Sequence, residues 1–120
     1  MALTYPGKPS RVQSFNVNCT VSETTYTLYT CPANCRAEVS MLMLVNVAGN
    51  LTASMEWNDA SSGNHVHILG GKNMTAGEYV LFTGATLILE SGDTLTITVT
   101  GSSPHADGLC TVTETFIPVG

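Results

Sequence analysis

The chain has 120 residues, which is long enough for one small domain with a single core and too short for two. Charged residues make up only 11% of it, against roughly 25% in a typical globular protein. The formal net charge is -5, the four cationic residues are scattered, and no apolar run approaches the roughly 18 residues of a membrane span, which argues against a nucleic-acid-binding or transmembrane protein.

The residues that replace the missing charge are Thr, Ser, Asn and Gly. Branched Thr favours strands, and the other three favour turns, so the composition indicates an all-β protein. The N-terminal sequence MALTYPGKP has no hydrophobic signal core, and we therefore expect a protein that is made in a cytoplasm and stays there.

Residues 1–10 contain two prolines and a glycine without any periodicity, which predicts an extended arm. Its Tyr5 and Pro6 are candidates for contact with a neighbouring subunit. From residue 11 to residue 120, short β-branched and aromatic runs alternate with turn residues, which predicts a single β-sandwich domain. The predicted strands span residues 12–19, 25–30, 37–47, 51–58, 64–70, 78–82, 86–89, 94–100 and 109–117.

The run from Met41 to Val45 is apolar at every position. A strand with this sequence needs cover on both faces. It is therefore either the most central strand of its sheet or a strand whose second face another subunit covers, which makes Met41 and Met43 interface candidates.

The clearest alternation lies in residues 94–100, where Leu95, Ile97 and Val99 face the core and the threonines face away. The last strand is less regular, because Glu114 lies between Val112 and Phe116 on one face. That pattern predicts a strand at the edge of a sheet or one that is partly exposed to solvent.

Five large aromatic residues are expected to supply most of the core anchors, namely Phe15, Trp57, Tyr79, Phe82 and Phe116. An exposed Trp57 would instead mark a contact surface or a platform for carbohydrate.

His65 and His67 lie two residues apart, so on a strand both project from one face and can supply two metal ligands. A third ligand would have to come from Asp59, His105 or Asp107. We favour a pair of surface or interface histidines and predict no metal site.

Cys19, Cys31, Cys35 and Cys110 form an even set, and three Asn-x-Thr triplets would be glycosylation acceptors in a secreted protein. Without a signal peptide, we expect buried thiols first, disulfides second and a metal site third. The Cys31-x-x-x-Cys35 spacing is one residue longer than the redox motif and precedes no helix, which argues against a redox enzyme.

Catalytic motifs are missing from the sequence. It contains no Gly-x-Ser-x-Gly segment and no glycine-rich phosphate loop, and Glu90 and Asp93 are expected to be solvated turn residues rather than an acid and base pair. We therefore predict a protein that is not an enzyme and that needs no cofactor.

Four segments in a fixed order carry a resemblance: TLYTCPANCRAEV (27–39), LVNVAGNLTASMEW (44–57), AGEYVLF (76–82) and LILESGDTLTITV (87–99). This order resembles that of small virion structural proteins of bacteriophages. The resemblance implies an antiparallel β-sandwich, often of jelly-roll type, that serves as a capsid decoration (cement) protein or as a head-to-tail or tail component. The Cys31 and Cys35 pair and Cys110 depart from the commoner pattern.

The expected function is therefore that of a non-enzymatic virion subunit, most of all a capsid decoration protein that stabilises the shell. The implied partners are the major capsid protein or other virion subunits, together with further copies of the chain in a homotrimer, and the implied location is the virion. The alternatives are a tail, neck or fibre subunit, a carbohydrate-binding sandwich and a metal-dependent enzyme that uses His65 and His67.

Overall fold

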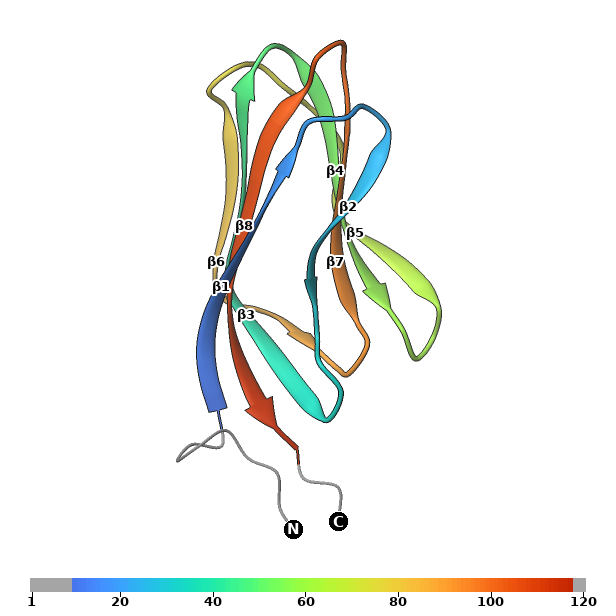
Figure 1. The fold of residues 1–120 in the computed structure, drawn as a ribbon, viewed down its shortest axis with the longest axis vertical. Helices are drawn as coiled ribbons and strands as arrows, with labels where there is room; N and C mark the ends of the chain where they lie inside the picture. Colours follow the sequence, from blue (N-terminus) through green and yellow to red (C-terminus); the bar gives the residue numbers. More distant parts are fainter. Residues whose placement is uncertain (1–9, 118–120) are drawn as a thin grey trace.

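The computed structural model describes residues 10–117, apart from the side chains of Ala85 and Thr86. This part of the chain forms two antiparallel sheets of four strands each, packed face to face (Figure 1). The first sheet has the order β1 (Ser10–Cys19), β8 (His105–Phe116), β3 (Cys35–Ala48) and β6 (Tyr79–Leu89). The second has the order β2 (Thr24–Thr30), β7 (Thr94–Thr100), β4 (Leu51–Asp59) and β5 (Asn64–Met74).

Consecutive strands repeatedly cross from one sheet to the other, which is the arrangement of a jelly-roll-like sandwich. The predicted all-β sandwich is therefore confirmed. Nine strands were expected, but the described residues form eight, because residues 79–82 and 86–89 belong to one strand, β6. Gly84 has a φ of +87°, and the pairing of β6 with β3 shifts register around it, so the extra residues bulge out and the strand continues.

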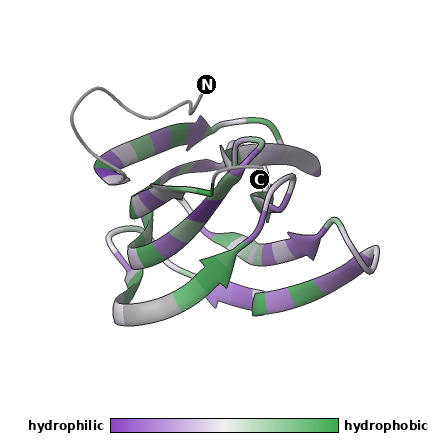
Figure 2. Ribbon diagram, turned by 90° about the horizontal axis from the view of Figure 1, so that it is seen from below, coloured by the Kyte–Doolittle hydropathy of each residue, from purple (hydrophilic) through white to green (hydrophobic). Residues whose placement is uncertain are grey.

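The core lies between the sheets and is built by strict alternation. Leu95, Ile97 and Val99 of β7 are all almost fully buried, as their spacing predicts. Leu42 and Leu44 of β3 face them from the first sheet with no exposed surface. The two layers, and the alternation of hydrophobic and hydrophilic residues along several strands, are visible end-on in Figure 2.

Strand β8 is an interior strand between β1 and β3, so the expectation of an edge or partly wet strand is wrong. Glu114 is only 1% exposed. Its carboxylate accepts hydrogen bonds from the Arg11 Nε, at 2.9 Å, and from the Tyr29 hydroxyl, at 2.6 Å. Because Tyr29 belongs to β2 of the other sheet, this bond ties the two layers together.

Asp93 is also buried, at 1% exposure, so it is not the solvated turn residue that was expected. Its carboxylate accepts hydrogen bonds from the Trp57 indole, the Ala60 amide and the Glu90 amide, at 3.2, 2.9 and 3.0 Å. The turn before β7 is thereby fastened to the end of β4.

The two ends of the described chain lie side by side. Ser10 at the start of β1 pairs with Thr115 near the end of β8. The predicted arm of residues 1–10 lies outside the described residues except for Ser10, which is already part of a strand.

Candidate assembly surface

The outer face of the first sheet carries apolar side chains on three adjacent strands. Met43 of β3 pairs with Leu81 of β6 on one side and with Leu109 of β8 on the other. The next outward residue of β3, Val45, pairs with Tyr79. Side chains of directly paired residues lie about 4.5–5.5 Å apart, so these groups form one continuous patch. We call it the apolar face, and it comprises Met41, Met43, Val45, Tyr79, Leu81 and Leu109.

Part of this face is strongly exposed. Tyr79 has 59% and Leu81 has 48% of its surface open to solvent, while Met41, Met43, Val45 and Leu109 are half-buried by their neighbours. Soluble monomers rarely expose a contiguous patch of large apolar side chains without a use for it, whereas single exposed ones are ordinary.

The local sequence of β3 explains the face. Inward-facing Leu42 and Leu44 belong to the core, and the residues between them are apolar as well. Strand β3 is an interior strand of its sheet, but within the described residues only solvent lies over Met43 and Val45. The structure thus leaves the second face of β3 open to a partner.

The outer face of the second sheet has the opposite character. Thr25 and Thr98 share a hydrogen bond of 3.2 Å between their hydroxyls, and Asn58 donates to the hydroxyls of Thr94 and Thr96, at 2.9 and 3.1 Å. These side chains form hydrogen bonds to each other, and their remaining donors and acceptors can bond to water. This face therefore needs no protein partner to cover it. The molecule therefore carries an apolar patch on one sheet and a hydroxyl-rich face on the other.

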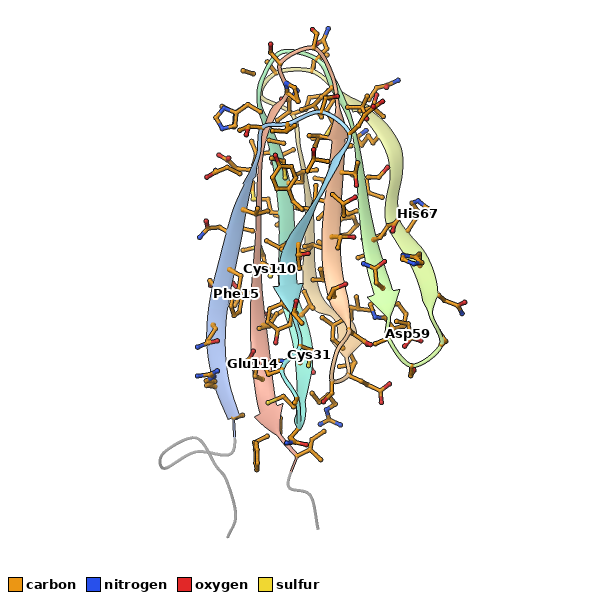
Figure 3. The ribbon with its side chains drawn as sticks, turned by 45° about the vertical axis from the view of Figure 1, so that its right-hand side comes forward. Phe15, Cys31, Asp59, His67, Cys110 and Glu114 are labelled. Atoms are coloured by element: carbon orange, nitrogen blue, oxygen red, sulfur yellow. The ribbon has the colours of Figure 1, made fainter. Side chains whose placement is uncertain are left out.

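The seven interface candidates from the sequence occupy different places. Met41 and Met43 lie on the apolar face, and Tyr5 and Pro6 lie outside the described residues. Trp57 packs against the core with its indole bonded to Asp93, so it presents no open aromatic platform. The two histidines, His65 and His67, are exposed on β5 of the second sheet. Figure 3 shows His67 on the outside of this strand.

The two histidines share one carboxylate. Glu56 of β4 lies 3.4 Å from His65 Nδ1 and 3.1 Å from His67 Nε2. The other proposed ligands lie apart: Asp59 bonds to Ser61 and Ser62, which lowers the pKa of its carboxyl, and His105 pairs with Asp107 on the first sheet. Over residues 10–117, no three His, Cys, Asp or Glu side chains are arranged to hold a metal ion.

All four cysteines are buried free thiols, which confirms the first of the three expectations for them. Burial raises the pKa of Cys19, Cys31 and Cys110 to about 11. Figure 3 shows Cys110 beside Phe15, its partner in the β1 and β8 pairing, and Cys31 near Glu114. Because the thiolate is the reactive form, these groups are poor nucleophiles and poor metal ligands.

Four members of the apolar face were not among the sequence candidates, namely Val45, Tyr79, Leu81 and Leu109. Tyr79 was even expected in the core, and its exposure of 59% corrects that expectation. The available signal was the uninterrupted apolar run Tyr79-Val80-Leu81-Phe82, which, like residues 41–45, is apolar on both faces of its strand.

No protein-family model matches the chain, and no curated protein matches it. Among solved structures, it is similar to a protein from a structure described as "Bacillus endospore appendages form a novel family of disulfide-linked pili", with 15% identity, a TM-score of 0.54 and coverage of 98% of this chain and 97% of that one. It is also similar to a chain of the cyanophage Pam1 capsid asymmetric unit, with 18% identity, a TM-score of 0.49 and coverage of 97% and 93%.

A third similar chain comes from infectious bursal disease virus, Gx strain, with 13% identity and a TM-score of 0.48. This chain matches over 94% of its own length but spans only 34% of the viral one. At 15% identity, the similarity to the Bacillus appendage protein shows a shared fold. The described residues contain no helix that is long and apolar enough to cross a membrane.

Proposed function

We propose that the chain is a non-enzymatic structural subunit of a bacteriophage virion, and specifically a capsid decoration protein that binds the shell through its apolar face. The observation that carries the proposal is the continuous, partly exposed apolar patch around Met43, Leu81 and Leu109 on the outside of the sandwich. Burying a fully exposed large apolar side chain stabilises a complex by about 1.5–3 kcal/mol before the costs of association, and the half-exposed side chains of this face contribute about half as much each.

The shortage of charge supports the same role. Only 11% of the residues are charged, so a partner that covers the apolar face has few ions to desolvate. The thiols add no reactive group, because burial raises the pKa of Cys19, Cys31 and Cys110 to about 11.

The finer parts of the proposal follow from the resemblance of the sequence to small phage virion proteins. The partners would be the major capsid protein or other virion subunits, and further copies of the chain would form a symmetric homo-oligomer, with a trimer expected on a shell. The predicted arm of residues 1–10, including Tyr5 and Pro6, would add contact area on the neighbour.

The test uses shells that lack this protein. Purified chain should bind them and raise the temperature at which they disassemble, whereas Met43→Glu, which places a charge in the middle of the apolar face, should lose most of the binding. Thr98→Glu is the matched control, because it puts the same charge on the hydroxyl-rich outer face of the other sheet, where its strand neighbours Thr25 and Ser54 are uncharged. Wild-type chain that leaves the shells bare, or equal binding by both variants, would contradict the proposal.

A filament subunit is a second candidate, favoured by the similarity to the Bacillus appendage pilus protein over nearly the full length of both chains. Here the apolar face would contact other copies of the chain instead of a shell. Electron microscopy of the concentrated wild-type protein distinguishes the two functions, because a filament subunit should form regular fibres that Met43→Glu abolishes.

A further inference from the structure

Strand β6 is an edge strand whose outward backbone groups are in position to pair with another strand. It lies last in its sheet, next to β3. The Asn46 amide donates to the Glu78 carbonyl at 2.8 Å, so residue 78 points its backbone groups towards β3. Backbone groups of a strand alternate in direction, and the pairing stays in register from Tyr79 to Thr83. The peptide groups of Tyr79, Leu81 and Thr83 therefore point away from the sheet.

Native sheets usually protect their edges with charge, short length or irregular backbone. At the other edge of the same sheet, β1 carries Arg11. In the second sheet, β5 carries Lys72 and two register shifts against β4, and β2 has only seven residues with one register shift. Strand β6 has 11 residues and no charged side chain, and its bulge leaves residues 79–83 regular.

The sequence of this segment is complementary to itself. Antiparallel pairing about a two-fold axis at Leu81 places Leu81 opposite its own copy, Tyr79 opposite Thr83, and Val80 opposite Phe82. Pairs of an aromatic and a β-branched residue are favourable neighbours across strands. The same register joins the outward peptide groups of residues 79, 81 and 83 with each other, so each of these residues exchanges backbone hydrogen bonds with its partner.

The flanking residues also suit two copies. Glu78, which precedes the strand, falls opposite Gly84, so the two like charges do not meet. Val80 and Phe82 pack against the core but are only half-buried at the edge, and a paired strand would cover the surface that remains. A charged residue anywhere in residues 79–83 would spoil this symmetry, and none is present.

We propose that two copies of the chain pair antiparallel through residues 79–83 of β6, which makes one continuous eight-stranded sheet across a two-fold axis at Leu81. The two apolar faces then lie next to each other on one side of this sheet. This inference shares one assumption with the proposed function, namely that the chain is a subunit that assembles with others. The strand pairing by itself produces a dimer. A trimer would need a second contact elsewhere on the surface, and the two contacts together would produce a complex of six copies.

The first test is a charge exchange at the axis. Leu81→Lys and Leu81→Glu each place like charges opposite each other, so each variant should be a monomer by light scattering, while the wild type has at least twice the chain mass of 12.6 kDa. An equimolar mixture of the two variants should pair again. Val12→Lys is the control, because Val12 is 68% exposed on the opposite edge of the same sheet, and this variant should pair like the wild type.

The second test does not depend on charge. Leu81→Cys places two thiols across the axis, where the roughly 5.5 Å between paired Cα atoms suits a disulfide. Under mild oxidation this variant should become a reducible covalent dimer, and Val12→Cys should not. A wild type that is monomeric at high concentration, a mixture of Leu81→Lys and Leu81→Glu that stays monomeric, or equal crosslinking at both cysteines would overturn the inference. If either charged variant does not fold, crosslinking at position 81 decides.

The two proposals fail in different ways. Shell binding by the wild-type protein, together with a Leu81→Cys variant that forms no covalent dimer, overturns the strand pairing and leaves the decoration role intact. Crosslinked pairs that leave shells bare overturn the decoration role and leave the strand pairing intact.

Discussion

Glu114, Tyr29 and Arg11 join three strands from both sheets around one buried carboxylate. A carboxylate with only 1% of its surface exposed needs partners, since an unpaired buried charge is strongly unfavourable. Arg11 supplies the opposite charge from the solvent side, where its own side chain is 45% exposed. Tyr29 supplies a hydroxyl from within the core, and loss of that hydroxyl is the cleaner perturbation because it leaves the ion pair in place.

We expect Tyr29→Phe to lower the free energy of unfolding by about 1–3 kcal/mol, because a buried carboxylate oxygen loses its hydrogen-bond donor. Urea denaturation at pH 7 measures the change. Tyr79→Phe removes the same hydroxyl from a ring that is 59% exposed and should change stability by less than about 0.5 kcal/mol. Equal effects of the two substitutions would show that the bond to Glu114 contributes nothing.

The position of Glu114 could not be predicted from its own strand. Its partners are 85 and 103 residues away in the sequence, so the alternation of residues 109–117 showed a polar residue on the inner face without showing what satisfies it. The burial of Asp93 could not be predicted for the same reason, because its donor Trp57 lies near the end of β4 and its donor Ala60 directly follows that strand, more than 30 residues earlier in the sequence.

At the scale of the strand, alternation decides which residues support the fold. The register of β7 follows directly from its sequence, because threonines separate its three core residues. In β3 both faces are apolar, so the sequence identifies a strand with two faces to cover but leaves open which residues line the core. The structure settles this by placing Leu42 and Leu44 inside and Met43 outside.

We therefore expect adjacent residues of β3 to respond very differently to truncation. Leu42→Ala creates a cavity at a fully buried position and should lower the free energy of unfolding by about 2–5 kcal/mol. Met43→Ala trims the outer face and should cost less than about 1 kcal/mol. Urea denaturation of both variants makes the comparison, and similar losses would mean that the inward and outward faces are assigned wrongly.

The boundaries of strand β6 could not be predicted from the sequence. Gly84 within residues 83–86 resembles a turn between two short strands, but its positive φ of 87° lets one strand bulge and continue. The apolar face depends on this strand, since Tyr79 and Leu81 meet Met43 and Val45 only through the pairing of β6 with β3. The sequence of β3 alone identifies Met41 and Met43 as surface candidates. Their neighbours on β6 and β8 can be identified only from the register in which these strands pair with β3.

For the whole molecule, the buried thiols make stability depend on pH. Burial raises the pKa of Cys19, Cys31 and Cys110 from 9.0 to about 11, so the folded state keeps protons that the unfolded state releases. A raised pKa of this kind contributes stability that is fully present below pH 9 and is lost as the pH rises towards 11.

Urea denaturation in a reducing buffer should show a loss of about 1 kcal/mol for each such thiol between pH 8 and pH 10. Cys110→Ala removes one of the groups, so its stability should decline less steeply over this range, although it starts lower because a buried side chain is shortened. Parallel profiles for the variant and the wild type would show that Cys110 ionises equally in both states.

The pairing of Ser10 with Thr115 brings both ends of the sandwich out at a single pole. Leu109 is six residues before Thr115 along β8, which puts the centre of the apolar face roughly 20 Å from that pole. A foreign peptide attached at Ser10 or Phe116, the two ends of the sandwich, should thus lie far from the apolar face. The domain could serve as a display scaffold, and a short linker between its ends would permit circular permutation.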